Sequence, residues 1–497
     1  MVGQIQRSVA RKGLSLHCSN LIKEIVASKT NSKTRSKKLS KAYRSASRIA
    51  LGISIERLCN RTIPKSLTSK SGVLSLFHED LEAIAYARGP EQQSAMTKSL
   101  IQYIDDNYKA ISEEDLGGIS ELISGHMVAW KKGEIKFEHN PSRRGFGKIY
   151  TPFDVTHHMC NQISKDLISK AESEESLFSM RVLDPAVGSG AFTAQLVRLL
   201  WKKAKRKWKL KNENEFRKNV CEFMIHGCDI DREALQLAKA VMWISAGCPE
   251  NGLKLNFSNS DSLKIGPCQD IKQWEKITNF EVGSGYDAVM GNPPYVRVRS
   301  SEISKFSTKE CRNLYSAFTE LSINLLNSSG SFLFIVPQSF VVSNDAECLR
   351  RLVLNQDAEF RLQVFDSVPD FLFDQGKIEP NSNTSINQRT AMIYLNRRKP
   401  RALYTSPLLR WRRNERDELF KKLKQVKIKH TDLVNGKIPM LESKSDLSVL
   451  RKLRKQEYTI GDKLDPKSSK LLYVPKAVRY FITAVPFDLE RSATILS

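Results

Sequence analysis

From about residue 146 onward, short apolar runs alternate along the chain with segments whose apolar residues recur at helical spacing. The apolar runs, which we expect to be strands, are residues 180–183, 223–227, 253–257, 287–290, 331–336, 360–365 and 390–395. The segments with helical spacing between them are residues 191–203, 232–245, 318–326 and 348–354. Such alternation is typical of an open parallel sheet wound with helices, so the pattern predicts an α/β fold.

Polar residues stand where the first four predicted strands end. Asp184 follows the first strand, Asp229 the second and Asp261 the third, and the fourth leads into Asn292. Open α/β sheets bind ligands at the carboxyl ends of their strands. The pattern therefore predicts a ligand site at this edge of the sheet.

The turn after the first strand, residues 184–191, reads DPAVGSGA and leads into a predicted helix. Its glycines allow the backbone to approach a ligand closely. The turn has neither the phosphate-loop motif nor the full dinucleotide motif, so a nucleoside triphosphate or NAD fits it poorly. Asp184 would instead attract an ammonium group, Asp229 would accept from ribose hydroxyls, and Asp261 could accept from an adenine amino group. Each carboxylate taken alone is more often a solvated strand end or a helix cap, but the three together describe S-adenosylmethionine.

The fourth strand runs into a stiff loop formed by Asn292, Pro293, Pro294 and Tyr295. Each proline fixes its own φ, restricts the residue before it and lacks an N–H donor. The loop thus presents hydrogen-bond acceptors next to one flat ring, which suits a planar ligand that carries an amino group. A plain Pro-Pro turn after a strand is the alternative when the loop is considered alone.

The net charge of the chain predicts a polyanionic partner. The 497 residues include 79 Lys and Arg against 54 Asp and Glu, a formal net charge of +25. Basic side chains favour binding to phosphates. The basic residues gather in five runs, at 29–44, 202–211, 410–416, 421–430 and 451–455.

The nine cysteines show no metal-binding spacing, so we expect reduced thiols and no metal site. No apolar run is long enough for a membrane span, and we expect a soluble, intracellular protein.

The motifs in this order resemble a known family, the DNA amino-methyltransferases of restriction-modification systems in the gamma arrangement. The resemblance covers residues 146 to about 396. Its motifs are GKIYTPFDVTHHM (147–159), LDPAVGSGAF (183–192), GCDID (227–231), SDSL (260–263), GNPPYVR (291–297) and GSFLFIVPQSF (330–340).

The resemblance implies a Rossmann-like class I S-adenosylmethionine-dependent methyltransferase fold and a DNA adenine-N6 methyltransferase. It assigns to catalysis Asn292, Pro293, Pro294 and Tyr295. It assigns to the cofactor Tyr150, Thr151, Pro152, Asp184, Ala186, Gly188, Gly190, Asp229, Ile230, Asp261 and Ser262. The target base would be flipped out of the duplex to stack on Tyr295. Phe371 and Phe373 are candidates for a second stacking ring, with buried packing as the other interpretation.

Several alternatives remain open at this point. Similar loops occur in cytosine-N4 and RNA base methyltransferases and in enzymes that methylate a glutamine amide, and a DNA-binding subunit without catalysis is a further alternative. We expect double-stranded DNA as a partner, with a specificity subunit or a cognate restriction endonuclease as further candidates. The resemblance implies a prokaryotic, cytoplasmic protein associated with the nucleoid.

Three regions follow from these patterns. Residues 1–145 are expected to be a helical, basic region, with helical spacing at 81–88 and 96–109. This region also contains a nuclease-like triplet, Glu134-Ile135-Lys136, which is common by chance. Residues 146–400 are the expected catalytic domain. Residues 401–497 are expected to be a basic linker and the beginning of a target-recognition region.

Overall fold

The computed structural model describes residues 151–247, 249, 252–268, 270–373 and 388–455, together with residues 102 and 106 and strands β1 (His126–Lys131) and β2 (Glu134–His139). The chain divides into two compact units. The first comprises Met1–Val296 with Phe373–Ile386, and the second comprises Arg297–Leu372 with Asn387–Ser497. The division falls just after the N-P-P-Y loop, inside the region that the sequence predicts as one catalytic domain.

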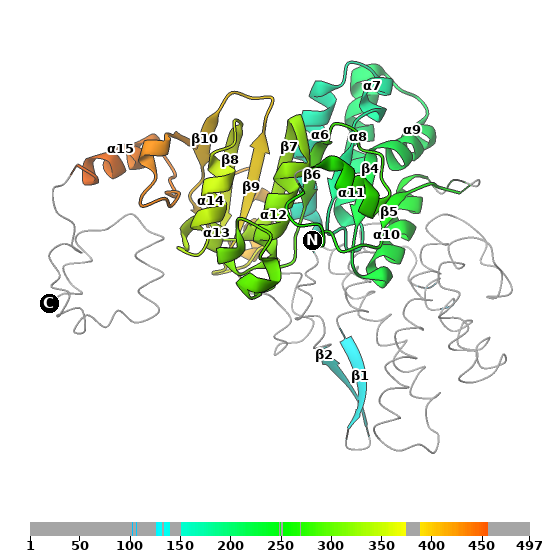
Figure 1. Ribbon diagram of the computed structural model, residues 1–497, viewed down its shortest axis with the longest axis horizontal. Helices are drawn as coiled ribbons and strands as arrows, with labels where there is room; N and C mark the ends of the chain where they lie inside the picture. The colour runs from blue at the N-terminus through cyan, green and yellow to red at the C-terminus, as the bar shows by residue number, and fades with distance from the viewer. Residues whose placement is uncertain are drawn as a thin grey trace. The chain divides into compact units, whose positions relative to one another are not determined.

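The first unit contains a parallel sheet with the strand order β5-β4-β3-β6, of which β4, β5 and β6 are labelled in Figure 1. These strands are β3 (Val182–Asp184), β4 (Ile225–Cys228), β5 (Asn256–Ser258) and β6 (Tyr286–Gly291). Each strand overlaps a run predicted from apolar residues, and its first and last residues lie within three residues of the ends of that run. The α/β architecture predicted from the sequence is therefore confirmed.

Register brings the ends of these strands to one level. Asp184 on β3 pairs with Gly227 on β4, and Leu183 pairs with Val289 on β6. Cys228, the last residue of β4, pairs with Ser258, the last residue of β5. We call this line of strand ends the carboxyl edge. The polar residues that follow the four strands consequently start from one edge of the sheet, as the sequence predicts.

Helices connect these strands and pack against one another. Their bounds are α6 (Phe153–Lys170), α7 (Glu174–Phe178), α8 (Ala191–Trp208), α9 (Glu213–Asn219), the π-helical turn η3 (Val220–Met224), α10 (Arg232–Ser245) and α11 (Ile271–Thr278). α8 packs against both α6 and α10. The face of α6 that is buried carries Val155, Met159, Ile163 and Leu167, whose spacing of four residues is that of one helical face.

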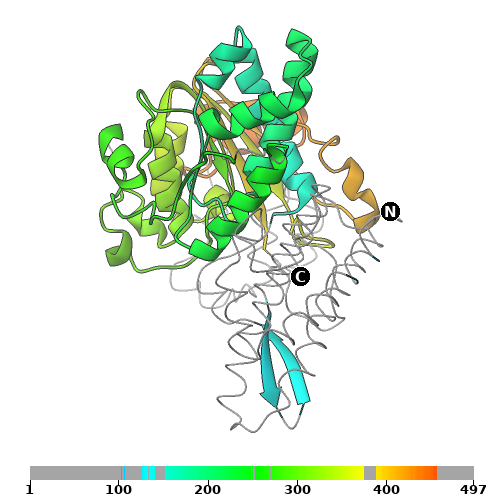
Figure 2. The ribbon, with the colours of Figure 1, turned by 90° about the vertical axis from the view of Figure 1, so that its right-hand side faces the viewer.

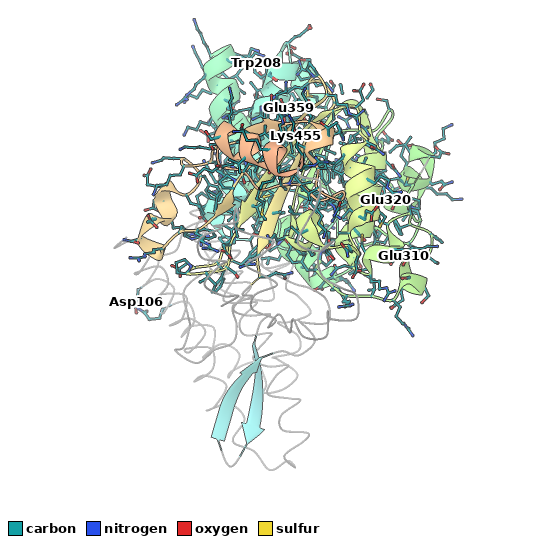
Figure 3. All side chains as sticks on the ribbon, turned by 90° about the vertical axis from the view of Figure 1, so that its left-hand side faces the viewer. Asp106, Trp208, Glu310, Glu320, Glu359 and Lys455 are labelled. Carbon is teal, nitrogen blue, oxygen red and sulfur yellow. The ribbon has the colours of Figure 1, made fainter. Side chains whose placement is uncertain are left out.

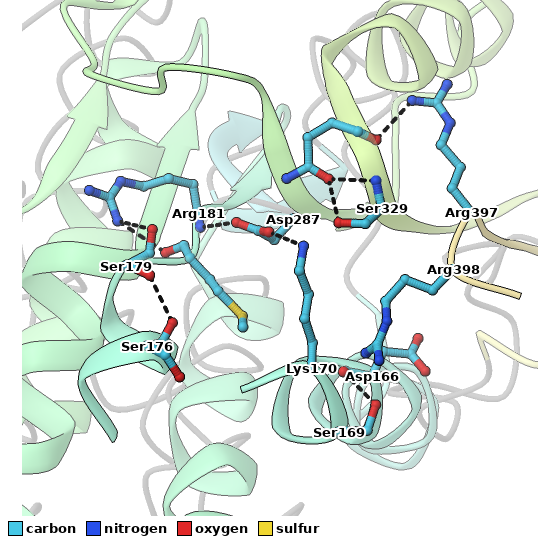
Figure 4. A network of polar contacts seen from close by, with 12 residues as sticks. Asp166, Ser169, Lys170, Ser176, Ser179, Arg181, Asp287, Ser329, Arg397 and Arg398 are labelled. Carbon is cyan, nitrogen blue, oxygen red and sulfur yellow. Dashed lines mark hydrogen bonds and ion pairs between the residues drawn. The ribbon is translucent and has the colours of Figure 1, made fainter. Parts of the chain in front are cut away.

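The end of α6 is fastened to β6. Asp287 on β6 accepts from Lys170 Nζ at 2.5 Å and from the backbone N–H of Arg181 at 2.8 Å (Figure 4). The last residue of α6 and the residue just before β3 therefore meet on one carboxylate. This contact fixes the strand that carries the N-P-P-Y loop.

The second unit contains a mixed sheet with the strand order β7-β9-β8-β10-β12, and β11 pairs with β8. Its strands are β7 (Leu326–Pro337), β8 (Glu359–Phe365), β9 (Thr390–Asn396), β10 (Ala402–Thr405), β11 (Leu408–Leu409) and β12 (Val426–Ile428). Its helices are α12 (Leu314–Leu325), α13 (Ser339–Val342), α14 (Glu347–Leu354) and α15 (Lys444–Leu453). Its 3₁₀ turns are η4 (Ser300–Ile303), η5 (Lys309–Cys311), η6 (Arg413–Glu418) and η7 (His430–Asp432).

Two features of this sheet differ from the prediction. β9 runs antiparallel to both β7 and β8, whereas the alternation predicted a parallel sheet. All seven residues of β9 are buried, and a strand buried on both faces gives a continuous apolar run that carries no information on its direction. In addition, β10 and β12 extend the sheet beyond residue 400, so the boundary placed there falls inside this unit.

Two strands in the N-terminal region were not expected. β1 and β2 pair antiparallel from His126↔His139 to Lys131↔Glu134 and form a hairpin, drawn in cyan in Figure 2. The nuclease-like triplet lies on β2. Residues 102 and 106 are helical, as predicted for 96–109, and Gln102 donates to Asp106, which is labelled in Figure 3. The rest of residues 1–145 lies outside the described residues.

Within the described part of the chain, no helix combines the length and apolar character needed to cross a membrane.

Candidate functional site

The glycine-rich turn after β3 is held in place by its own backbone and by the neighbouring strand. Asp184 is 2% exposed, and its Oδ1 accepts from the N–H of Ala186 at 3.1 Å. The N–H of Val187 donates to the carbonyl of Cys228 at the end of β4. Gly190 has φ +81° and is the N-cap residue just before α8, and a Cβ there would lie 3.1 Å from Ala238 Cα on α10. Only glycine combines this conformation with so close a helix contact.

Asp229 joins this turn to the turn after β4. Its Oδ2 accepts from the N–H of Gly188 at 2.8 Å, and its Oδ1 accepts from the N–H of Asp231 at 2.8 Å. The carboxylate is half-buried, while the neighbouring Ile230 side chain is 64% exposed. The carboxylate thus fixes two turns at once and keeps part of its surface accessible to a ligand.

The turn after β5 is fastened to the same place. Ser262 is buried, and its hydroxyl donates to the carbonyl of Pro185 at 2.6 Å. Asp261 is exposed and accepts from the N–H of Leu263. Three separate segments predicted as cofactor contacts, at 184–190, 229–230 and 261–262, are therefore brought together at the carboxyl edge.

The N-P-P-Y loop begins directly beside Asp184. A Cβ on Gly291 would lie 2.7 Å from Asp184 Oδ1, a distance that real Cβ atoms do not reach. Asp184 is buried and hydrogen-bonded, so it has little room to move. Glycine at 291 therefore allows the loop after β6 to lie against the carboxylate of the glycine-rich turn.

Thr151 orients the amide of Asn292. Asn292 Nδ2 donates to Thr151 Oγ1 at 3.1 Å, which leaves the amide oxygen as the acceptor of the group. Thr151 is buried and, with the buried Pro152, precedes α6. The predicted contact at Tyr150 lies outside the described residues.

Aromatic rings meet beside this loop. Tyr295 is half-buried, and its ring lies edge-to-face with that of Phe373, with centroids 6.5 Å apart. Phe373 is 6% exposed. The structure thus brings Phe373 to Tyr295, while Phe371 is half-buried and its carbonyl accepts from Arg416.

Two contributors to this edge were missed by sequence reasoning. Asn259 Nδ2 donates to the carbonyls of Asp229 and Ile230, and so supports the turn after β4 from the turn after β5. Gln195 Nε2 donates to His157 Nδ1 and joins α8 to α6. The run N-S-D-S at 259–262 contains residues that commonly bond to backbone, and this was the signal for Asn259.

Burial raises the pKa of the Asp184 carboxyl from its ordinary value of 3.8 to about 8, and the negative charge of Asp229 adds to this effect against the Ala186 hydrogen bond. The folded chain then holds a proton on Asp184 between about pH 4 and pH 8, while the unfolded chain has lost it. Through this group, the free energy of unfolding should therefore fall as pH rises across that window, by at most about 1.4 kcal/mol per pH unit.

Urea unfolding of the wild type and Asp184→Asn from pH 4 to pH 8 measures this effect. The stability difference between the two proteins should shift in favour of Asp184→Asn as pH rises. A difference that does not change with pH would show that Asp184 titrates normally in the fold.

Several arginines of the predicted basic runs form hydrogen bonds within the chain. Arg410 Nε donates to the buried Asp366 at 2.7 Å, Arg416 donates to the carbonyl of Leu372 at 2.7 Å, and Arg451 donates twice to Asp432. At the end of α8, by contrast, Lys202, Lys205 and Arg206 are exposed. The run at 29–44 lies outside the described residues.

Among the residues that the structure describes, no group of three or more His, Cys, Asp or Glu side chains is arranged to hold a metal ion.

Comparison with known proteins relates the chain to one group of enzymes. Residues 224–367 match the family model of the Eco57I restriction-modification methylase. The Type II methyltransferase M.BsuBI of Bacillus subtilis is 30% identical over 263 residues, which cover 49% of this chain and 44% of M.BsuBI. The Type II methyltransferase M.TthHB8I of Thermus thermophilus is 32% identical over 109 residues, which cover 18% of this chain and 25% of that protein. The chain thus spans less than half the length of these relatives.

Solved structures share the fold at low sequence identity. The cryoEM structure of the DrdV–DNA complex has a TM-score of 0.55 at 13% identity and covers 86% of this chain and 46% of that one. A nuclease-deletion mutant of the Type ISP restriction-modification enzyme LlaGI, in complex with a DNA substrate mimic, has a TM-score of 0.50 at 14% identity and covers 85% of this chain and 38% of that one. These findings relate the chain to the restriction-modification methyltransferases, and its Rossmann-like α/β fold is shared with the DrdV and LlaGI structures.

Proposed function

We propose that this protein is a site-specific DNA methyltransferase that transfers a methyl group from S-adenosylmethionine to the exocyclic N6 of adenine in double-stranded DNA. We further propose that it serves a restriction-modification or related defence system, with a specificity subunit or a cognate endonuclease as its partner. The observation that carries the proposal is the meeting of two loops. The N-P-P-Y loop lies against Asp184 through Gly291, and Asn292 is oriented there by Thr151.

The residues at the carboxyl edge fit the proposed methyl donor. Asp229 keeps accessible surface beside a turn whose N–H groups it already orders, which suits a pair of ribose hydroxyls. Asp261 is exposed in the turn after β5 and could accept from an adenine amino group, and Asp184 would ionise beside an ammonium group. In this proposal the cofactor also lies against the turn that contains Ala186, Gly188 and Gly190, and against the exposed apolar side chain of Ile230.

The chemistry needs positioning more than proton transfer. S-adenosylmethionine, when bound, supplies an electrophilic methyl group on a sulfonium. The N6 nitrogen is a poor nucleophile because its lone pair is delocalised into the ring. Asn292 Oδ1 and the Pro293 carbonyl each accept one N–H of this amino group, which draws the nitrogen towards tetrahedral geometry. These hydrogen bonds strengthen as positive charge develops on nitrogen.

The two rings beside the loop fit a flipped base. Tyr295 would stack on the extruded adenine, and Phe373 would support the Tyr295 ring through its edge-to-face contact. Pro293 and Pro294 keep the loop stiff, so the amide and the ring hold their relative positions. DNA as substrate is supported by the net charge of +25 and by the DNA-bound structures of DrdV and LlaGI, which share the fold.

We expect Tyr295→Ala to weaken stacking on the target base by about 1–3 kcal/mol. Duplex DNA with 2-aminopurine in place of the target adenine reports the flipped base by its fluorescence. The fluorescence rise on binding should change in Tyr295→Ala and stay as in wild type in Phe223→Ala, whose ring is 50% exposed in η3. An unchanged rise in Tyr295→Ala would remove this residue from the base site.

Incubation of the purified protein with labelled S-adenosylmethionine and unmethylated duplex DNA, tRNA or total protein tests the function. We expect the labelled methyl group to appear in DNA. Digestion of this DNA to nucleosides should then yield labelled N6-methyldeoxyadenosine. Deoxy-N4-methylcytidine would instead assign the chain to cytosine. Label in tRNA would indicate an RNA base methyltransferase and label in protein a glutamine amide. DNA binding without any transfer would indicate a non-catalytic subunit.

A further inference from the structure

Cys311 and Cys348 place two thiols against each other in the second unit. Their sulfur atoms lie 3.5 Å apart, although the residues are separated by 37 positions in the chain. Cys311 is the last residue of η5 and Cys348 the second residue of α14. Both are half-buried, whereas the other described cysteines, Cys160, Cys221, Cys228 and Cys268, are buried. Among the described cysteines, this pair alone combines mutual contact with access to solvent.

The two thiols differ in acidity because they share a hydrogen bond. Hydrogen bonding from the Cys311 thiol lowers the pKa of Cys348 to about 7, and backbone N–H groups at the start of α14 act in the same direction. The same contact, together with burial, raises the pKa of Cys311 well above its ordinary value. When the pair loses its first proton, Cys348 therefore becomes the thiolate and Cys311 keeps its proton. A thiolate is the nucleophilic form of cysteine.

A fixed positive charge lies near the pair. Arg350 is 1% exposed and interacts electrostatically with both thiols. Its guanidinium donates to the carbonyls of Phe340, Ser343 and Gly436 at 2.9, 2.6 and 2.8 Å. These acceptors are neutral, but the positive charge of Arg350 interacts with the Glu347 carboxylate as well as with the two thiols, so it is divided among these groups.

The backbone that carries Cys311 is well ordered by local contacts. The buried Glu320, labelled in Figure 3 with Glu310, accepts from the N–H groups of Ser307 and Thr308 at 3.0 and 2.9 Å. The N–H of Val298 donates to the carbonyl of Arg312. Cys311 thus lies on a turn that hydrogen bonds hold in place, and Cys348 lies on a helix. Joining their sulfur atoms should therefore cost little further conformational entropy.

We propose that Cys311 and Cys348 form a dithiol oxidation site, at which a hydroperoxide converts the pair to an intramolecular disulfide. The Cys348 thiolate attacks one peroxide oxygen, the O–O bond breaks, and a sulfenic acid forms while hydroxide, or an alkoxide from an organic peroxide, leaves. The Cys311 sulfur then attacks the Cys348 sulfur and displaces hydroxide, which leaves as water with the Cys311 proton. Two thiols are oxidised and one peroxide is reduced.

This site goes beyond the proposed methyl transfer and does not depend on it. The disulfide would link the turn at 309–311, which follows the N-P-P-Y loop in the chain, to α14. A reducing dithiol such as dithiothreitol would restore both thiols.

Treatment of the full chain with a small excess of hydrogen peroxide tests the proposal. The intact mass should fall by about 2 Da for the two hydrogens lost. A non-reducing digest should contain the peptides of Cys311 and Cys348 joined to each other, and dithiothreitol should separate them. In Cys311→Ser, the sulfenic acid on Cys348 should persist and be trapped by dimedone. In Cys348→Ser, Cys311 should remain unlabelled.

Cys268→Ser is the matched control, because Cys268 is a buried thiol outside the pair. It should form the Cys311–Cys348 crosslink as wild type does. Pairing of either cysteine with another residue would overturn the proposal. So would persistence of both thiols in the folded chain, or accumulation of sulfinic acid on Cys348 without the crosslink.

Discussion

We expect Asn292→Ala to transfer methyl groups about 100- to 1000-fold more slowly than wild type. The substitution removes the amide oxygen proposed to accept an N–H of the target amino group. That interaction strengthens as charge develops in the transition state, so its loss should reduce kcat rather than the affinity for S-adenosylmethionine. Single-turnover transfer of a tritiated methyl group measures the rate, and calorimetric titration measures cofactor affinity.

Two further variants sharpen this experiment. Asn292→Asp keeps acceptor oxygens, and the Thr151 hydroxyl, which now accepts from Asn292 Nδ2, can donate to the new carboxylate. We therefore expect Asn292→Asp to retain more activity than Asn292→Ala. Asn344→Ala changes an exposed asparagine in the second unit and should behave as wild type. Near wild-type transfer by Asn292→Ala would remove Asn292 from catalysis.

Asp229→Ala should weaken S-adenosylmethionine binding by about a hundredfold, or roughly 2.7 kcal/mol. The carboxylate orders the N–H groups of Gly188 and Asp231, and in the proposed complex it also accepts from the ribose. Its removal therefore costs ligand contacts and also loosens the turn that forms the site. Equilibrium dialysis with labelled cofactor measures the dissociation constant directly.

Asp270→Ala provides the matched control for Asp229→Ala. Asp270 also accepts a backbone N–H, from Lys272 at the start of α11, so its loss should cost about 1 kcal/mol of stability through the helix cap. Its cofactor affinity should equal that of wild type. A dissociation constant of Asp229→Ala within about threefold of wild type would contradict the ribose assignment.

Apolar spacing predicted much of the fold because burial follows it closely. The run 191–203 became α8, the spacing at 232–245 gave the bounds of α10, and the run 360–365 became β8. The long helix α6 was not predicted as a helix, since its motif was interpreted only as a segment before the first strand. β10 and β12 escaped notice because short strands in a basic stretch give little periodic signal.

Some residues of the site were predicted from the sequence and others were missed. Asp184, Asp229 and the N-P-P-Y loop were found because each directly follows a strand, and strand ends of a parallel sheet share one edge. Asn259 and Gln195 were missed because their roles arise from hydrogen bonds to residues 30 and 38 positions away. Phe373 was a candidate because it lies in the long segment before the seventh predicted strand, and its contact with Tyr295 joins parts of the chain that no local pattern connects.

The sequence by itself determined the α/β alternation, the order of the motifs and the residue types at the strand ends, because these depend on local spacing and backbone chemistry. Only the tertiary structure decided the direction of β9, the approach of Gly291 to Asp184 and the meeting of Cys311 with Cys348. It also decided the orientation of the Asn292 amide by Thr151, 141 residues away. These features are contacts between distant segments, and packing and strand register fix them rather than any pattern along the chain.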